Sequence, residues 1–150
     1  MNQVLVINGP NLNRLGEREP EIYGSVTLDA LNQRLAAEAS LLGFGLTSFQ
    51  SNHEGEIIDR IQRAPEEADA VILNPGGLTH TSVSLRDAVE ACPLPVIEVH
   101  LSNLFAREEF RRRDLVAPVC AGVIMGLGAD GYVAALRVLQ LRLAPSRIPE

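Results

Sequence analysis

The chain has 150 residues, of which 46% are hydrophobic, and its net charge is −6. This size and composition predict one domain around one compact core, and the acidic balance argues against a general nucleic-acid binder, whose phosphate contacts need a basic face. All 13 basic residues are arginine, and this excludes a lysine Schiff base, a pyridoxal-phosphate lysine and the lysine of a phosphate-binding P-loop. An anionic ligand must therefore meet a local cluster of arginines.

The two cysteines and the first residues of the chain indicate where in the cell the protein is located. Cys92 and Cys120 are far apart, match no metal-ligand spacing and lie among apolar residues, so we expect two buried structural thiols. The first residues enter an apolar run directly, and we expect neither a signal peptide nor a membrane span. These features predict a cytoplasmic protein.

Short apolar runs alternate with longer segments of helical period, a pattern typical of a parallel sheet covered by helices on both faces. Five strands are predicted, over residues 3–8, 45–50, 69–74, 95–100 and 119–125. Five β/α units in one small domain predict a flavodoxin-like α/β fold with strand order 2-1-3-4-5. The domain spans residues 1–150, and we expect the tail 145–150 to fray.

Four helices are predicted from apolar stripes of helical period. A capping-box pattern from Ser51 to Glu54 opens the second helix, and a turn containing Gly126, Gly128 and Gly131 precedes the last. The stripes are, in chain order, Leu28, Leu31, Leu35, Ala39 and Leu42; Ile57, Ile58 and Ile61; Val83, Ala88 and Val89; and Val133, Leu136, Leu139 and Leu143.

In this strand order the ligand crevice lies beyond the carboxyl ends of the strands, between the first and the third. Asn8, Asn74 and His100 end strands one, three and four, so we expect them to converge there. Glu98 and His100 are two apart in a strand, so both point to the same face, where a carboxylate orients the imidazole and favours its protonated form. His100 ends its strand and polar residues follow, which favours a general acid over a core histidine satisfied by its neighbour.

The connection over residues 11–24 is long for a βα unit and is interpreted as a lid or binding loop. Its Tyr23 is a candidate base, although a loop tyrosine is more often a packing residue. A free phenol has a pKa near about 10, so acting near neutral pH requires a downward shift of about two to three units, or about 3 to 4 kcal/mol. Arg18 and Arg107 are the candidates to supply it. The acidic residues of this loop must then face solvent: Glu17, Glu19 and Glu21.

The segment 74–82 turns from the third strand into a helix and presents glycines, hydroxyls and free amides, which suits an anion or a polyhydroxylated ligand. Turn chemistry with an N-cap explains these residues except His80. A hydrolase triad of Ser82, His80 and an acid receives little weight, because no G-x-S-x-G elbow is present. Arg107 and Arg111 are four apart, so in a helical segment they project from one face.

These motifs closely resemble type II 3-dehydroquinase, the 3-dehydroquinate dehydratase of the shikimate pathway and of aromatic amino acid biosynthesis. The resemblance runs over nearly the whole chain, through residues 8–13, 18–24, 50–55, 74–82, 98–103 and 107–111. It implies a hydro-lyase that uses no cofactor and no metal and eliminates water in the anti sense from 3-dehydroquinate, giving 3-dehydroshikimate through an enolate. It also accounts for the missing lysine, since the unrelated type I enzymes use a lysine Schiff base and this family uses a tyrosine base.

The resemblance also implies roles for single residues. Tyr23 would abstract the proton next to the ketone, with Arg18 and Arg107 favouring its phenolate. His100, oriented by Glu98, would protonate the departing hydroxyl. The other implied site residues hold water or substrate: Asn11 a water at the enolate oxygen, Leu101 and Ser102 the carboxylate, and Asn74, His80 and Arg111 the ring oxygens.

The implied assembly is a dodecamer of four trimers in which Asp87 approaches the neighbouring subunit's site, with neither nucleic acid nor membrane as a partner. The competing hypothesis is a non-catalytic flavodoxin-like module that holds a small polar metabolite or nucleotide at the same rim. Such a module would keep Asn74, His80 and Arg111 but would need no tyrosine beside an arginine.

Overall fold

A five-stranded parallel sheet forms the centre of the computed structural model, which describes residues 1–17, 19–23 and 25–143, without the side chain of Tyr23. The strand order β2-β1-β3-β4-β5 confirms the predicted order. The strands are β1 (Gln3–Asn8), β2 (Gly45–Gln50), β3 (Ala70–Asn74), β4 (Val96–His100) and β5 (Gly122–Met125). The predicted fraying of residues 145–150 lies outside the described residues.

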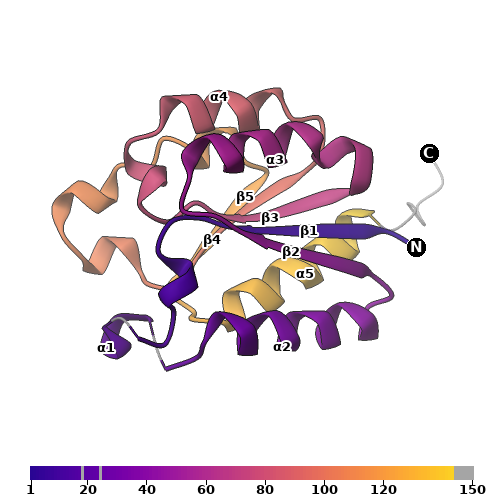
Figure 1. Ribbon diagram of the computed structural model, residues 1–150, viewed down its shortest axis with the longest axis horizontal. Helices are drawn as coiled ribbons and strands as arrows, with labels where there is room; N and C mark the ends of the chain where they lie inside the picture. The colour runs from indigo at the N-terminus through magenta and orange to yellow at the C-terminus, as the bar shows by residue number, and fades with distance from the viewer. Residues whose placement is uncertain (18, 24, 144–150) are drawn as a thin grey trace.

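Helices cover both faces of this sheet, with α3 (Glu54–Glu67) and α4 (Val83–Ala91) on one side and α2 (Leu28–Leu41) and α5 (Asp130–Leu143) on the other (Figure 1). Successive side chains of a strand point to opposite faces, so a strand covered on both sides is apolar throughout. In β1, Val4 and Val6 join the core under α2 and α5, while Leu5 and Ile7 join the core under α3 and α4.

Several element boundaries differ from the prediction. β5 begins at Gly122 and not at 119, because Ala117–Val119, which contains Pro118, forms a 3₁₀ helix. The predicted capping box is wrong: His53 is the N-cap of α3, and the Ser51 hydroxyl accepts from the His53 amide and donates to Glu56.

Two other predictions are also corrected. In α4 the buried positions are Leu85, Ala88 and Val89, whereas Val83 is 59% exposed. Both cysteines are free, as expected, but Cys92 and Cys120 are half-buried rather than buried. Within the described ranges, no helix is both long and apolar enough to cross a bilayer.

The carboxyl ends of β1, β3 and β4 meet at one rim of the sheet. Asn8 pairs directly with Asn74 in the β1–β3 register, and Asn8, Asn74 and His100 are all buried. The connections that cover this rim include α1 (Pro20–Tyr23) and the segment between β4 and β5 (Figure 1). The rim is therefore the place where polar side chains from distant parts of the chain are held together.

Candidate active site

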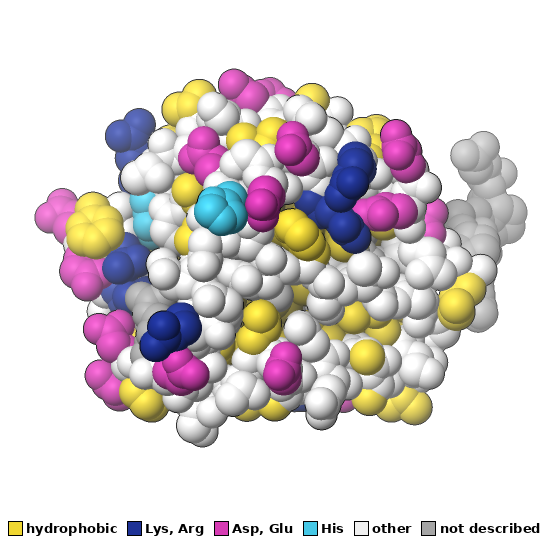
Figure 2. Space-filling view, in the orientation of Figure 1, with side chains coloured by type: hydrophobic (Ala, Val, Ile, Leu, Met, Phe, Trp, Pro, Cys, Tyr) yellow, Lys and Arg dark blue, Asp and Glu magenta, His cyan; other side chains and the backbone are white. Residues whose placement is uncertain are grey.

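A cavity of about 160 Å³ opens at this rim. Most of the predicted site residues line it, namely Asn11, Asn74, His80, His100, Leu101, Ser102, Arg107 and Arg111. A larger hollow of about 450 Å³ lies between α3 and α4, but neither histidine nor arginine lines it. We therefore place the chemistry at the rim, where Figure 2 shows histidine and arginine side chains at the left of the view with acidic groups among them.

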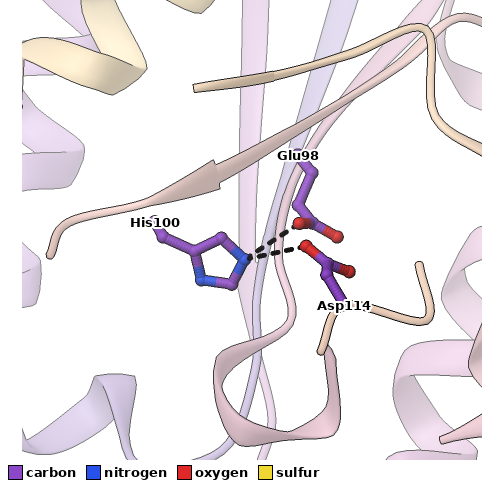
Figure 3. Close-up of side chains that lie close together, drawn as sticks. All are labelled: Glu98, His100 and Asp114. Carbon is purple, nitrogen blue, oxygen red and sulfur yellow. Dashed lines mark hydrogen bonds and ion pairs between the residues drawn. The ribbon is translucent and has the colours of Figure 1, made fainter. Parts of the chain in front are cut away.

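Three titratable side chains meet behind the cavity: Glu98, His100 and Asp114 (Figure 3). His100 Nε2 lies 3.0 Å from Glu98 Oε2 and 4.0 Å from Asp114 Oδ2. The Thr79 hydroxyl lies 3.0 Å from Glu98 Oε1 and 3.2 Å from Asp114 Oδ1. Since Nε2 faces the carboxyl groups, Nδ1 lies on the far side of the imidazole ring.

The charge state of this group differs from the expected one. Burial raises the pKa of Glu98, and the neighbouring Asp114 carboxyl group raises it further. Burial lowers the pKa of His100, and the charges of His80 and Arg107 lower it too, although Asp114 opposes them. Glu98 orients the imidazole, but a neutral ring beside a protonated carboxyl group is favoured over the expected imidazolium–carboxylate pair.

Asp114 is the residue of this group that the sequence does not predict. Its Oδ1 accepts from the amides of Val116 and Ala117, at 2.9 and 2.8 Å, and so fixes the entry to the 3₁₀ helix Ala117–Val119. Its Oδ2 is buried with no hydrogen-bond partner. The only sequence signal is a single acid that ends the basic run 111–113.

The turn after β3 depends on Asn74. Its Oδ1 accepts from the Gly76 amide at 3.1 Å, and its Nδ2 donates to the Tyr132 hydroxyl at 2.8 Å. That hydroxyl in turn donates to Asn8 Oδ1 at 2.6 Å, so a residue of α5 ties the ends of β1 and β3 together. Gly76 has φ +60°, and a Cβ there would lie 3.0 Å from the Pro10 carbonyl oxygen.

The segment 74–82 leads from β3 into α4, which begins at Val83, and the segment itself contains a 3₁₀ helix, Gly76–His80, that was not predicted. The Ser82 hydroxyl accepts from the Leu85 amide as the N-cap of α4, and this capping role accounts for Ser82 without a triad. His80 Nδ1 lies 2.7 Å from the Arg113 carbonyl oxygen, so Nδ1 carries the proton and donates it.

The two cavity arginines do not share one helix, so that prediction is wrong. Arg107 follows the 3₁₀ helix Leu104–Ala106 with an extended backbone, and Arg111 belongs to a second one, Glu109–Arg112. Both side chains nevertheless line the cavity. Arg107 Nη1 donates to the Ser102 hydroxyl at 3.3 Å, and Arg111 pairs with Glu108 and lies over the Phe110 ring.

The predicted lid contains a 3₁₀ helix, Leu12–Arg14, and the single turn α1. Asn11 has φ 71°, and its amide donates to Asn52 Oδ1 at 2.9 Å. The acidic side chains required to face solvent are exposed: Glu17, Glu19 and Glu21. The predicted Arg18 and the Tyr23 side chain lie outside the described residues.

Among the described residues, the candidate metal donors are those of Glu98, His100 and Asp114, which lie within 4.8 Å of one another. Thr79 and His100 already satisfy the Glu98 oxygens, and two backbone amides bind Asp114 Oδ1. Hydrogen bonds within the protein account for these contacts, so we assign the cluster to a carboxyl proton on Glu98 and not to a metal ion. The remaining predicted residue, Asp87, lies away from the cavity, exposed on α4.

Comparison with known proteins shows which family the chain resembles. A family model described as dehydroquinase class II matches residues 2–140. The chain is 56% identical to the 3-dehydroquinate dehydratase of Pelotomaculum thermopropionicum over 135 residues, covering 90% of this chain and 94% of that protein. It is 54% identical to that of Bacillus subtilis over 139 residues, covering 93% and 94%. The crystal structure of type II dehydroquinase from Propionibacterium acnes superposes with a TM-score of 0.91 at 41% identity, over 94% of this chain and 97% of that one.

Proposed function

Since the chain belongs to the class II dehydroquinase family and is a hydro-lyase, a type II 3-dehydroquinate dehydratase, we propose that it works with a tyrosine base and a histidine acid. The reaction is a cofactor-free anti elimination of water from 3-dehydroquinate through an enolate, giving 3-dehydroshikimate in the shikimate pathway. The observation that carries the proposal is the cavity in which His100 and Arg107 meet at the sheet rim.

His100 is the general acid of this scheme. It lines the cavity while its Nε2 is bound by Glu98, so the opposite nitrogen is available to a departing hydroxyl. As the carbon–oxygen bond breaks, its electron pair goes to oxygen, and the imidazole supplies the proton that makes the leaving group water. A positioned acid of this kind accelerates a reaction by about 10²–10⁴-fold.

Tyr23 is the base, and Arg18 and Arg107 favour its phenolate. The support is that Arg107 lines the cavity, while the acidic side chains of the lid are exposed and do not oppose the phenolate from within. The phenolate removes the proton next to the ketone. The charge that develops on the ketone oxygen is stabilised by a water that Asn11 holds.

The substrate is held on both sides of these groups. The amides of Leu101 and Ser102 and the Ser102 hydroxyl take the carboxylate, and Arg107 orients that hydroxyl by donating to it. Asn74, His80 and Arg111 hold the ring oxygens. These three roles are supported by the position of all three side chains on the cavity wall.

The activity is tested by ultraviolet absorbance after 3-dehydroquinate is added to the folded protein. We expect a rise as the conjugated enone forms, and a flat trace from assembled protein would contradict the function. We expect Tyr23→Phe to bind substrate and to turn over almost none, with the exposed Asp29→Asn as the matched control. A Tyr23→Phe rate close to normal would remove Tyr23 as the base.

We also propose that the protein is cytoplasmic and assembles as a dodecamer of four trimers. Asp87 then approaches a neighbouring subunit's site from its exposed position on α4, beside the hollow between α3 and α4. The measurement is the mass in solution by light scattering, expected at twelve times the 16.2 kDa chain. A monodisperse smaller species that is fully active would contradict the assembly.

A further inference from the structure

Asp114 is buried beside the acid but has no part in the mechanism above. Its Oδ1 is occupied by two backbone amides and the Thr79 hydroxyl. Its Oδ2 is buried without a hydrogen-bond partner, 4.0 Å from His100 Nε2. Figure 3 shows this carboxylate and that of Glu98 side by side, on the same side of the imidazole ring.

Two carboxyl groups this close cannot both ionise readily, because like charges in a buried site disfavour each other. Asp114 is the one stabilised as an anion, since it accepts from two amides, whereas Glu98 accepts from none and is 0% exposed. The proton of the pair is therefore held by Glu98. Thr79, within reach of one oxygen of each carboxyl group, keeps the two in register.

We propose that Asp114 is a positioning residue for the acid step: its carboxylate keeps a proton on Glu98, which passes it to His100 when His100 protonates the leaving hydroxyl. The proposal rests on the proposed role of His100. Asp114 acts through Glu98 and does not contact the reacting atoms.

The proton balance closes without an added reactant. The Nδ1–H of neutral His100 goes to the departing oxygen, which also takes the electron pair of the breaking carbon–oxygen bond. The Glu98 carboxyl proton moves to Nε2, so the imidazole stays neutral and Glu98 becomes a carboxylate. The proton that the base took from carbon returns through solvent to His100 Nδ1, and Nε2 gives its proton back to Glu98, which completes the cycle.

The surroundings of His100 favour this neutral relay. Glu98 faces it from β4, Asp114 from the loop before β5, His80 from the turn after β3, and Arg107 from the segment after β4. Arg111 lines the same cavity, and burial and the two carboxyl groups raise the pKa of Cys120. A buried imidazolium next to Arg107 is costly, whereas a proton on Glu98 relieves the repulsion from Asp114.

The test is the pH dependence of kcat in Asp114→Asn. The substitution keeps an Oδ1 acceptor for the Val116 and Ala117 amides but removes the charge. Glu98 then loses its proton at lower pH, and we expect the alkaline limb of the profile to move down by about one pH unit or more. The exposed Asp29→Asn is the control and should leave the limb in place. An unmoved limb in folded Asp114→Asn would overturn the proposal.

A second measurement avoids dependence on activity. The infrared carbonyl band of a protonated carboxyl group should be present in the parent protein at neutral pH and absent from Glu98→Gln. In Asp114→Asn it should disappear at lower pH than in the parent. If Asp114→Asn does not fold, Asp114→Ser keeps a short acceptor for the amides and carries the same expectation. A band unaffected by Glu98→Gln would overturn the proposal.

Two further variants separate this proposal from the function on which it rests. In a Glu98→Gln background, Asp114→Asn should cause no additional movement of the limb, and a further movement would overturn the relay. His100→Ala with near-normal turnover would instead remove the proposed acid itself. Activity lost to a chelator and restored by a divalent ion would overturn the assignment of the cluster to a proton.

Discussion

At the scale of single residues, Glu98 links catalysis to stability. Its pKa rises from 4.5 to about 9 on folding, first through burial and then through Asp114. A raised pKa in the folded state gives stability that is complete below the unfolded value and is lost as the pH rises through the folded value. The buried acid therefore makes the free energy of unfolding fall between about pH 5 and pH 9.

We expect Glu98→Gln to remove this fall. A glutamine amide mimics the protonated carboxyl group, donates within the same cluster and has no proton to lose. The urea midpoint of the variant, measured from about pH 5 to pH 9, should stay level where that of the parent declines, although turnover is impaired. Parallel decline of both midpoints would show that Glu98 is not held protonated by the fold.

At the scale of elements, Tyr132 ties α5 to the ends of β1 and β3. It is fully buried, and its hydroxyl bonds both Asn8 and Asn74. We expect Tyr132→Phe to lower the free energy of unfolding by about 1–3 kcal/mol, because two buried amides lose a partner. KM should rise more than kcat falls, since Asn74 holds substrate in the proposed mechanism and takes no part in proton transfer.

The matched control for Tyr132→Phe is Thr47→Val, which removes an exposed hydroxyl on β2. Urea unfolding and steady-state kinetics should both leave this control close to the parent. If Tyr132→Phe behaves like the control, the network between α5 and the two strands does not hold Asn74 in place.

The junction of β1 and β3 also depends on a glycine. A Cβ at Gly9 would lie 2.6 Å from the Pro75 carbonyl oxygen, and the Gly9 amide donates to the Asn74 carbonyl at 2.8 Å. We expect Gly9→Ala to cost about 1–3 kcal/mol, because backbone and not a flexible side chain must move. Substrate affinity should fall with stability, since the shift displaces the cavity wall.

Gly55→Ala is the opposite case on the same chain. A Cβ at Gly55, in the first turn of α3, meets nothing within 4 Å. Alanine is the better helix former, so thermal unfolding should show a gain of up to about 1 kcal/mol with unchanged kinetics. Equal effects of the two substitutions would refute the close approach at Gly9.

The same elements show which parts of the fold the sequence could predict. β1 and β2 have the predicted bounds. The buried apolar run of β1 can be recognised from local pattern alone, without knowledge of its partners. The errors occur where a single contact overrides local pattern. Ser51 bonds Glu56 instead of capping a helix, and the extended backbone at Arg107 separates it from the helix of Arg111.

The same distinction applies to the site: residues placed by the strand pattern were predictable, and residues placed by a single tertiary contact were not. His100 and Asn74 were predictable because they end strands of known order, and a parallel sheet brings such ends together. Asp114 was not predictable, because its position depends on a loop folding back onto Thr79 and Glu98. No spacing within residues 111–117 encodes that contact.

At the scale of the whole molecule, the side chains around the cavity carry charge of the opposite sign to the net charge of the chain. The chain carries −6, yet arginine and histidine side chains lie at the end of the molecule where the cavity opens (Figure 2). Arg107 and Arg111 line that cavity and favour an anion there. An acidic surface with a local basic cavity admits a carboxylate substrate without creating a general nucleic-acid binder.

The proposed assembly makes a prediction that a single subunit cannot test. If Asp87 approaches the site of a neighbour, a site is complete when Tyr23 comes from one chain and Asp87 from another. Co-expression of Tyr23→Phe with Asp87→Ala should then yield sites that carry both native residues. Random assembly should restore up to roughly a quarter of the parent kcat per subunit.

The control pairs Tyr23→Phe with His100→Ala, two changes in one subunit's own site. This mixture cannot form a complete site, so absorbance assays should give the mean of the two variants. The mixture with Asp87→Ala should exceed the mean of its own two variants, because the missing groups are exchanged between subunits. If it gives only the mean, Asp87 serves its own subunit or none, and the shared site is wrong even if light scattering finds a dodecamer.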